Sequence, residues 1–209
     1  MAHFTKSDIN DLDRLIRLSL VNSITGYKPA NLIGTVNGDG LTNLAIISSV
    51  VHMGSDPAIL GFFMRPMVTE RHTMENIQET GFYTINHVHE TIAEKAHFTS
   101  ADFSREESEF DMCQLQAEFK DGFAAPYVSE SRVQIGMQLA EKMDISLNKT
   151  ILVIGYVEHI YIQDAGYPAP GVVDLNAVGT ICISGLDTYH NVSKIATFPY
   201  ARPNNIPEF

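Results

Sequence analysis

The chain has 209 residues, of which 44% are hydrophobic and 19% are charged. This apolar content excludes an intrinsically disordered chain and is enough to bury one substantial core. With 25 acidic against 14 basic residues the formal net charge is −11, which disfavours nucleic acids and anionic membrane surfaces as partners because both carry negative charge.

The longest apolar run, Ile151 to Val157, is far shorter than the ~20 residues that cross a bilayer. The first residues also lack the apolar centre of a signal peptide. Two cysteines, Cys113 and Cys182, are too few for a disulfide framework or a cysteine-based metal cluster. We therefore expect a cytoplasmic protein with no membrane segment.

The first predicted element is a helix over about residues 7–20, capped by Ser7, which we expect to lie across a sheet. Two β-branched apolar runs follow, at 31–36 and 41–51. The sequence NGDG between them is typical of a tight turn, so the pair predicts a β-hairpin. A turn at 54–57 leads to a third strand at 58–64.

The second half of the chain begins with a predicted helix at about 70–80, which ends at Gly81. A strand at 82–88 and a short helix at about 91–98 come next. Ser104 and Glu107 have the spacing of a capping box, which predicts a further short helix. Period-two alternation then indicates a strand at 132–140, and 150–162 is the longest strand candidate. The remaining tail is proline-rich and expected to be extended.

These elements include at least six strands without strict alternation of strand and helix, so a doubly wound parallel sheet is disfavoured. We predict a mainly β protein, a predominantly antiparallel barrel with helical insertions. One domain over residues 1–209 is the simplest organisation, with an N-terminal helix at about 7–20, the barrel at about 30–162 and an extended C-terminal tail.

The first candidate site is the segment 38–43, which approximates the dinucleotide-binding pattern G-x-G-x-x-G with Asn43 in its last position. It leads into a β-branched run, whereas that motif needs a helix whose N-terminus faces the pyrophosphate. A hairpin turn is therefore the favoured interpretation.

The second candidate lies between the strand at 58–64 and the following helix. Positively charged and hydroxyl side chains gather there, namely Arg65, Thr69, Arg71, His72 and Thr73. Arginines beside a helix N-terminus are suited to a phosphate monoester. An ordinary solvated helix start, with a surface pair of Arg71 and Glu75, explains the same residues equally well.

A third candidate is the polar interruption of the run 41–51 by Asn43, Ser48 and Ser49. Small residues would let a flat heteroaromatic ring approach the backbone amides of the strand edge. Serines bonded to neighbouring backbone are the favoured alternative when this feature is taken alone.

The histidines do not indicate a metal site. His87 and His89 share a face in a strand, but no third ligand stands at a recognisable spacing. His97, with Thr99 and Ser100, is a polar cluster that could reach a phosphate or a ribityl chain. No nucleophile motif or general base is evident. A phosphate cluster and a strand edge without acid–base machinery suit a cofactor that brings its own redox chemistry.

Several segments in this order resemble the flavin reductase-like proteins with an FMN-binding split barrel. The resemblance is strongest over about residues 22–112, through SITGYKPANLIGTV, LTNLAIISSVVHMGSDPAILGFFMRP, ERHTMENIQETGFYTINHV and AEKAHFTSADFSREESEFD. It implies a six-stranded antiparallel split barrel with Greek-key features, and a homodimer that holds FMN near its subunit interface.

The resemblance also implies roles for individual residues. Asn43 and the stretch Ser48, Ser49 and Val50 would line the isoalloxazine ring. The phosphate would be held by Arg65, Thr69, Arg71, His72 and Thr73, and the ribityl and phosphate side would be completed by Asn86, His97, Thr99, Ser100 and Ala101. Tyr189 and His190 would approach the nicotinamide or the open face of the ring.

The predicted function is an NAD(P)H-dependent flavin reductase that passes hydride to FMN. The alternative is an FMN-containing electron carrier, similar to the flavoredoxins, that is reduced by a partner protein. A third possibility, a dinucleotide-binding enzyme built on Gly38 and Gly40, requires a helix after Asn43 and is excluded by a strand there.

Overall fold

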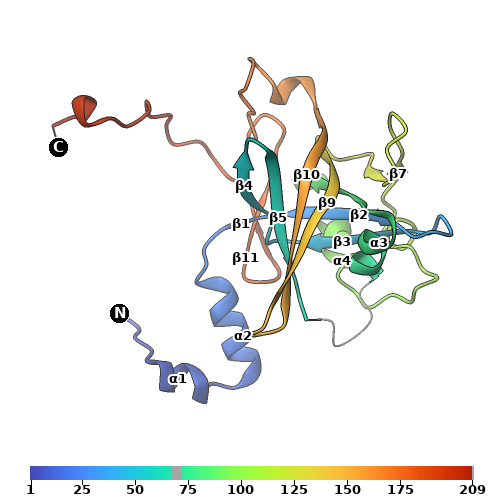
Figure 1. Cartoon of the computed structure of the whole chain (residues 1–209). Coiled ribbons are helices and arrows are strands. Elements are labelled where there is room, and N and C mark those ends of the chain that lie inside the picture. Colours follow the sequence, from blue (N-terminus) through green and yellow to red (C-terminus); the bar gives the residue numbers. More distant parts are fainter. Residues whose placement is uncertain (67–71, 209) are drawn as a thin grey trace.

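Seven strands form one antiparallel sheet in the order β3-β2-β6-β9-β10-β5-β4. The computed structural model describes residues 1–66 and 72–208. The bounds of these strands are β2 (Asn31–Val36), β3 (Thr42–Ile47), β4 (Val51–Ser55), β5 (Ala58–Met64), β6 (Phe82–His87), β9 (Val133–Ile145) and β10 (Thr150–Ile162). In Figure 1, β4, β5, β9 and β10 stand upright, while β2 and β3 run across them.

The two edge strands of this sheet, β3 and β4, are consecutive in the chain but do not pair with each other, so the barrel is split between them. Only residues 48–50 separate them. The hydroxyl of Ser49 donates to the carbonyl of Phe63 at 2.9 Å and accepts from its N–H at 3.1 Å, which anchors this segment to β5. The single strand predicted at 41–51 is thus two strands, and the predicted six-stranded antiparallel split barrel is otherwise confirmed.

The predicted hairpin is formed by β2 and β3, which pair from Asn31 with Ile47 to Val36 with Thr42. Its turn includes Gly40 at φ 85°, and the N–H of Asn37 donates to the carbonyl of Leu41 at 3.1 Å. Strand β3, and not a helix, continues after Asn43, which excludes the dinucleotide-binding interpretation. The predicted strands at 58–64 and 150–162 have the observed bounds of β5 and β10.

Helices are inserted between the strands, as expected. α3 (His72–Thr80) ends where the N–H of Gly81 donates to the carbonyl of Ile77 at 2.9 Å. η1 (Glu90–Ile92) and α4 (Ala93–Phe98) follow β6. The prediction of a helix that begins at Ser104 is wrong. The N–H of Ser104 donates to the Glu107 carboxylate at 3.1 Å, and the residues between them form a turn. The next helix is α5 (Glu109–Met112).

The N-terminal helix predicted at 7–20 is instead two helices, α1 (Lys6–Asp11) and α2 (Arg14–Ser23). Thr5, not Ser7, caps α1 in a capping box with Asp8. The Asp13 side chain caps α2 through the N–H of Leu15 at 2.8 Å. Neither helix buries a residue, and both project from the barrel (Figure 1), so the expectation that this segment lies across a sheet is also wrong.

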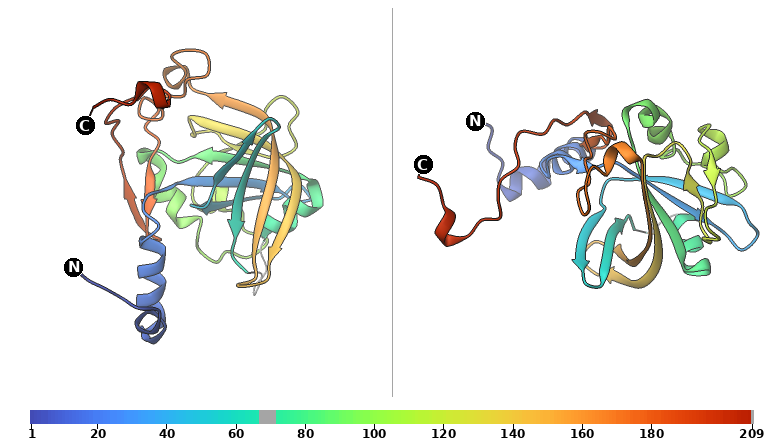
Figure 2. Two further views of the ribbon diagram at one scale, coloured as in Figure 1. Left: turned by 60° about the vertical axis from the view of Figure 1, so that its left-hand side comes forward. Right: turned by 90° about the horizontal axis from the view of Figure 1, so that it is seen from above.

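Short elements complete the fold. They are β1 (Lys28–Pro29), β11 (Cys182–Ser184) and β12 (Thr188–His190), which form a three-stranded sheet, the pair β7 (Ala117–Glu118) and β8 (Tyr127–Val128), and the turns η2 (Asp164–Gly166) and η3 (Pro203–Asn205). Beyond β12 the tail is extended and leaves the body (Figure 2). Among the described residues, no helix combines the length and the apolar character needed to cross a membrane.

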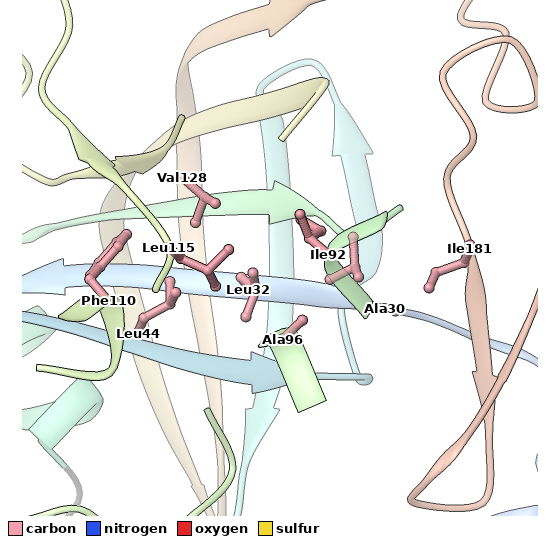
Figure 3. Packing of buried hydrophobic residues seen from close by; sticks show 10 residues of the cluster. Ala30, Leu32, Leu44, Ile92, Ala96, Phe110, Leu115, Val128 and Ile181 are labelled. Atoms are coloured by element: carbon pink, nitrogen blue, oxygen red, sulfur yellow. The ribbon is translucent and has the colours of Figure 1, made fainter. Parts of the chain in front are cut away.

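The two largest buried clusters of the described residues hold these elements together. One lies within the barrel and includes Ile33, Phe62, Tyr83, Met137 and Val153. The other packs the inserted helices on β2 and β3, and its members are Ala30, Leu32, Leu44, Val88, Ile92, Ala96, Phe110, Leu115, Val128 and Ile181 (Figure 3). The second cluster fixes α4 and α5 beside β3, which is where the candidate site lies.

Candidate functional site

A cavity of about 620 Å³ opens where β3 ends and the barrel changes from β3 to β4. This volume lies within the range of small-molecule sites. Its walls come from the end of α2, β3, residues 48–49, the end of β5, the start of α3, α4 and the loop after it, α5 and the β11–β12 hairpin. The lining residues are Asn22, Asn43, Ala45, Ile46, Ile47, Ser48, Ser49, Phe63, Met64, Arg65, His72, Thr73, His97, Thr99, Ser100, Ala101, Asp102, Phe103, Glu109, Ile183, Leu186, Asp187 and Tyr189.

The outer edge of β3 is covered by side chains from the inserted helices. Glu109 accepts a hydrogen bond from the N–H of Leu44 at 2.8 Å, and the hydroxyl of Thr99 accepts one from the N–H of Ile46 at 3.0 Å. Thr99 in turn donates to the carbonyl of Ala96 at 2.8 Å. Because both edge N–H groups are occupied, this part of the strand is closed to a ligand.

The backbone between β3 and β4 is different. The N–H groups of Ser48, Ser49 and Val50 have no hydrogen-bond partner among residues 1–66 and 72–208. Ser48 and Ser49 line the cavity, and all three residues are partly buried. Unpaired, partly buried amides are costly unless a ligand or water satisfies them. Ser48 and Ser49 therefore offer two consecutive hydrogen-bond donors at the cavity wall, whereas Val50 does not line the cavity.

Three of the residues predicted to hold a phosphate line the cavity, namely Arg65, His72 and Thr73. Asn43 donates to the hydroxyl of Thr73 at 2.9 Å, which links β3 to the first turn of α3. The other two predicted phosphate residues, Thr69 and Arg71, lie outside the described residues, as does the surface pair of Arg71 with Glu75. In the described part, Glu75 forms an ion pair with Arg105.

The other side of the cavity is built by His97 and Tyr189, whose Nδ1 and phenol oxygen are 3.1 Å apart. Their rings meet edge to face with centroids 5.7 Å apart. Burial, reinforced by the carboxylate of Asp187, raises the pKa of Tyr189 to about 12, so its hydroxyl keeps its proton at neutral pH. Ser100 donates to the carbonyl of His97 at 2.7 Å and holds the loop after α4.

Eleven of the residues predicted from the sequence line this cavity, which are Asn43, Ser48, Ser49, Arg65, His72, Thr73, His97, Thr99, Ser100, Ala101 and Tyr189. Three others do not. Val50 packs against the barrel cluster, and the His190 ring lies against Tyr27 and bonds to Ser184. Asn86 is fully buried.

The side chain of Asn86 is committed to the core by three hydrogen bonds. It donates to the carbonyl of Leu32 at 3.1 Å and to the hydroxyl of Thr84 at 2.8 Å, and it accepts from the N–H of Val128 at 3.0 Å. These bonds occupy both the Nδ2 and the Oδ1 atoms of Asn86, and they join β6 to β2 and β8. The structure thus places Asn86 as a connecting residue within the sheet and away from the cavity wall.

Sequence reasoning missed Glu109 and the residues contributed by the β11–β12 hairpin, Ile183, Leu186 and Asp187. Burial raises the pKa of Glu109, while the N–H of Leu44 and the charge of His72 act in the opposite direction. A lone glutamate at the start of a four-residue helix carries no recognisable motif. Its importance follows only from a contact with a strand 65 residues earlier.

His87 and His89, two residues apart in the sequence, each form a hydrogen bond within the protein. His87 Nδ1 lies 3.4 Å from the hydroxyl of Thr180, and His89 Nε2 lies 2.9 Å from the carbonyl of Glu130. Across the described residues, no three His, Cys, Asp or Glu side chains gather as metal ligands.

Comparison with known proteins gives a consistent result. A family model described as "Flavin reductase like domain" matches residues 27–178. A solved structure from Shewanella frigidimarina NCIMB 400, provisionally named a flavin reductase with a split barrel domain, is 45% identical and superposes with a TM-score of 0.93 over 96% of this chain and 100% of that one. An uncharacterized protein of Aquifex aeolicus (strain VF5) is 28% identical over 131 residues, which are 62% of this chain and 66% of that protein.

A more distant structure has the same fold. Flavoredoxin of Desulfovibrio vulgaris (Miyazaki F) is 20% identical and has a TM-score of 0.74 over 84% of this chain and 92% of that one.

Proposed function

This chain belongs to the flavin reductase-like family of flavin-related oxidoreductases, and we propose that it binds FMN in the cavity beside β3 and reduces it with NAD(P)H. The observation that carries the proposal is that the N–H groups of Ser48 and Ser49, which line the cavity, have no partner within residues 1–66 and 72–208. The edge of a flavin ring presents carbonyl oxygens and ring nitrogens that accept hydrogen bonds, so a row of backbone donors is well matched to it.

The cationic end of the cavity supports the same ligand. Arg65, His72 and Thr73 supply charge and a hydroxyl where α3 begins, and the N–H groups of a helix's first turn lack intrahelical partners. A phosphate monoester is stabilised by this combination. The ligand would thus lie in the cavity with its ring at residues 48–49 and its phosphate near Arg65, His72 and Thr73.

The protein itself would act by positioning and exclusion. When bound, FMN would supply the redox chemistry, since its ring can accept hydride from a nicotinamide. Ser48 and Ser49 would orient the ring through their main-chain donors, which also stabilise negative charge that develops on it. His97 and Tyr189, bonded to each other, would hold one wall of the cavity at fixed distance.

The test begins with the visible absorption spectrum of the purified protein and identification of any released chromophore. Titration of flavin-free protein with FMN, followed by flavin fluorescence, should saturate at one FMN per chain. Steady oxidation of NADH or NADPH with excess free FMN supports the reductase. FMN binding without nicotinamide oxidation supports the electron carrier and removes the reductase proposal. No binding removes both.

We further propose that two copies of the chain pair, that the acceptor of the electrons is free flavin or a redox partner protein, and that the protein works in the cytoplasm. Cys113 and Cys182 are buried free thiols, the form that a reducing compartment favours. Light scattering at several concentrations tests the pairing, with a mass of about twice 23.2 kDa expected.

A further inference from the structure

We propose that the C-terminal segment, residues 191–208, is an arm that packs on the apolar surface of α2 in a second copy of this chain. This inference rests on the proposed pairing of two copies and not on the proposed flavin chemistry. Both segments lie outside the stretch 27–178 that matches the family model.

α2 has apolar residues on opposite sides and buries none of them. Leu15, Leu18 and Val21 follow each other at a spacing of three, and Ile16, Leu20 and Ile24 at a spacing of four, so the two rows lie on different sides of the helix. Ile16 is 58% exposed and Leu15 is 68% exposed. A surface helix packed on one core needs a single apolar stripe, so apolar rows on two sides leave α2 with apolar surface that the body does not bury.

The C-terminal segment has the same character. Ile195 is 99% exposed, Phe198 83% and Tyr200 82%. Residues 1–27 and 191–208 contain thirteen of the twenty-eight large apolar side chains that are exposed in the described chain, although they are only about a fifth of its length. Such concentrated exposure marks an interaction surface.

Charge favours a second copy as the occupant. Residues 1–27 carry three basic and three acidic side chains, and residues 191–209 carry two basic and one acidic side chain. The net charge of −11 therefore comes from the part between them. Two such acidic chains repel each other unless they meet through neutral surface, and the two terminal segments provide it.

The geometry allows exchange between copies. α1 and α2 project from the same side of the body as the tail, which runs away from α2 (Figures 1 and 2). Fully extended, its 18 residues reach about 60 Å, compared with a diameter of roughly 40 Å for a compact domain of this length. The arm is thus long enough to cross a neighbouring molecule, and symmetric exchange would bury both arms and both helices.

The experiment uses full-length chains with differently sized tags, one carrying Ile195→Cys and the other Ile16→Cys. Mixed under mild oxidation, they should give a disulfide-linked heterodimer, because the native thiols are buried. The matched control replaces Ile195→Cys with Leu147→Cys, at a residue that is 95% exposed in the β9–β10 turn, and should give no such product. Equal cross-linking by the control overturns the inference.

A second measurement concerns affinity. The pair Ile195→Ser and Phe198→Ser should raise the dissociation constant of the dimer at least tenfold in sedimentation or light scattering, whereas Leu147→Ser should leave it unchanged. A dimer that is indifferent to the first pair overturns the arm and leaves the pairing intact. If the wild-type protein is a monomer at all concentrations, both the exchange of arms and the pairing of two copies are overturned. A third variant carries both Ile16→Cys and Ile195→Cys in one chain and is diluted until the protein is monomeric. A disulfide within that chain would show that the tail folds back on its own α2, which also overturns the proposed exchange.

Discussion

The carboxylate of Glu109 accepts a hydrogen bond from the backbone N–H of Leu44 at 2.8 Å. Leu44 is fully buried in β3, and Glu109 is 8% exposed at the start of α5. The bond satisfies an edge N–H of the barrel and ties the inserted helix to the strand that lines the cavity.

Removal of this acceptor should be costly. Glu109→Ala leaves the N–H of Leu44 buried without a partner, which costs about 1–3 kcal/mol in the free energy of unfolding. Glu109→Gln keeps an oxygen acceptor and should cost less. Urea unfolding of both variants checks the order. Equal losses for Ala and Gln would show that the hydrogen bond does not carry the effect.

Protonation of His87 should destabilise the fold at mildly acidic pH. Burial lowers its pKa from 6.5 to about 4. Between these values the unfolded chain binds a proton that the folded chain does not, so stability falls as pH falls from about 6.5 to about 4, by at most about 1.4 kcal/mol per pH unit. His87→Gln removes this contribution.

The measurement is the free energy of unfolding of wild type and His87→Gln from pH 8 to pH 4. The wild type should lose stability relative to the variant below about pH 6.5, and the difference should be constant above it. Parallel curves over the whole range would rule out His87 as the titrating group.

Binding of FMN should depend on Arg65, which lines the cavity, and on Arg71, which the family resemblance assigns to the phosphate. Arg65→Ala and Arg71→Ala each remove a candidate charged hydrogen bond to phosphate, which is worth about 1.5–3 kcal/mol, or roughly ten- to hundredfold in the dissociation constant. Lys142→Ala, in a surface pair with Asp144, is the control. An unchanged constant in either arginine variant takes that residue out of the site.

Two glycines should respond differently to substitution by alanine. A Cβ at Gly155 would collide with the phenol oxygen of Tyr83 and the backbone carbonyl of Gln138, whereas one at Gly38 would meet mainly the end of the Glu79 side chain. Gly155→Ala should therefore lose about 1–3 kcal/mol through overpacking, and Gly38→Ala much less because Glu79 can move. Thermal unfolding compares them, and equal changes would contradict the argument.

Local patterns in the sequence predicted those parts of the fold that depend on local physics. The turn at 37–40 and the strand bounds of β5 and β10 follow from turn chemistry and β-branched runs. The break at residues 48–50 could not be predicted, because it depends on the bond between Ser49 and Phe63 on another strand. The division of the N-terminal helix was missed because the apolar spacing continues across Asp13, whose capping of Leu15 interrupts it.

The candidate site was predicted to a similar depth. Residues near the hairpin and the start of α3 were found because polar groups interrupt apolar runs there. Asn86 was assigned to the site although its amide forms hydrogen bonds within the core. The sequence alone does not distinguish an asparagine that binds a ligand from one that joins strands. Glu109 and Leu186 reach the cavity through tertiary packing, for which the local sequence holds no signal.

The three residues that join β3 to β4 have a consequence for how a closed barrel can acquire a binding function at all. A barrel whose strands are bonded to neighbours around the full circumference leaves no main-chain polarity for another molecule. Here β3 and β4 are joined only by residues 48–50 and do not pair. Among the described residues, the N–H groups of these three residues have no partner and can donate to another molecule. The fold thereby combines a rigid barrel with a short stretch of backbone that can donate hydrogen bonds. Because these donors belong to the main chain, a side-chain substitution alone does not remove them.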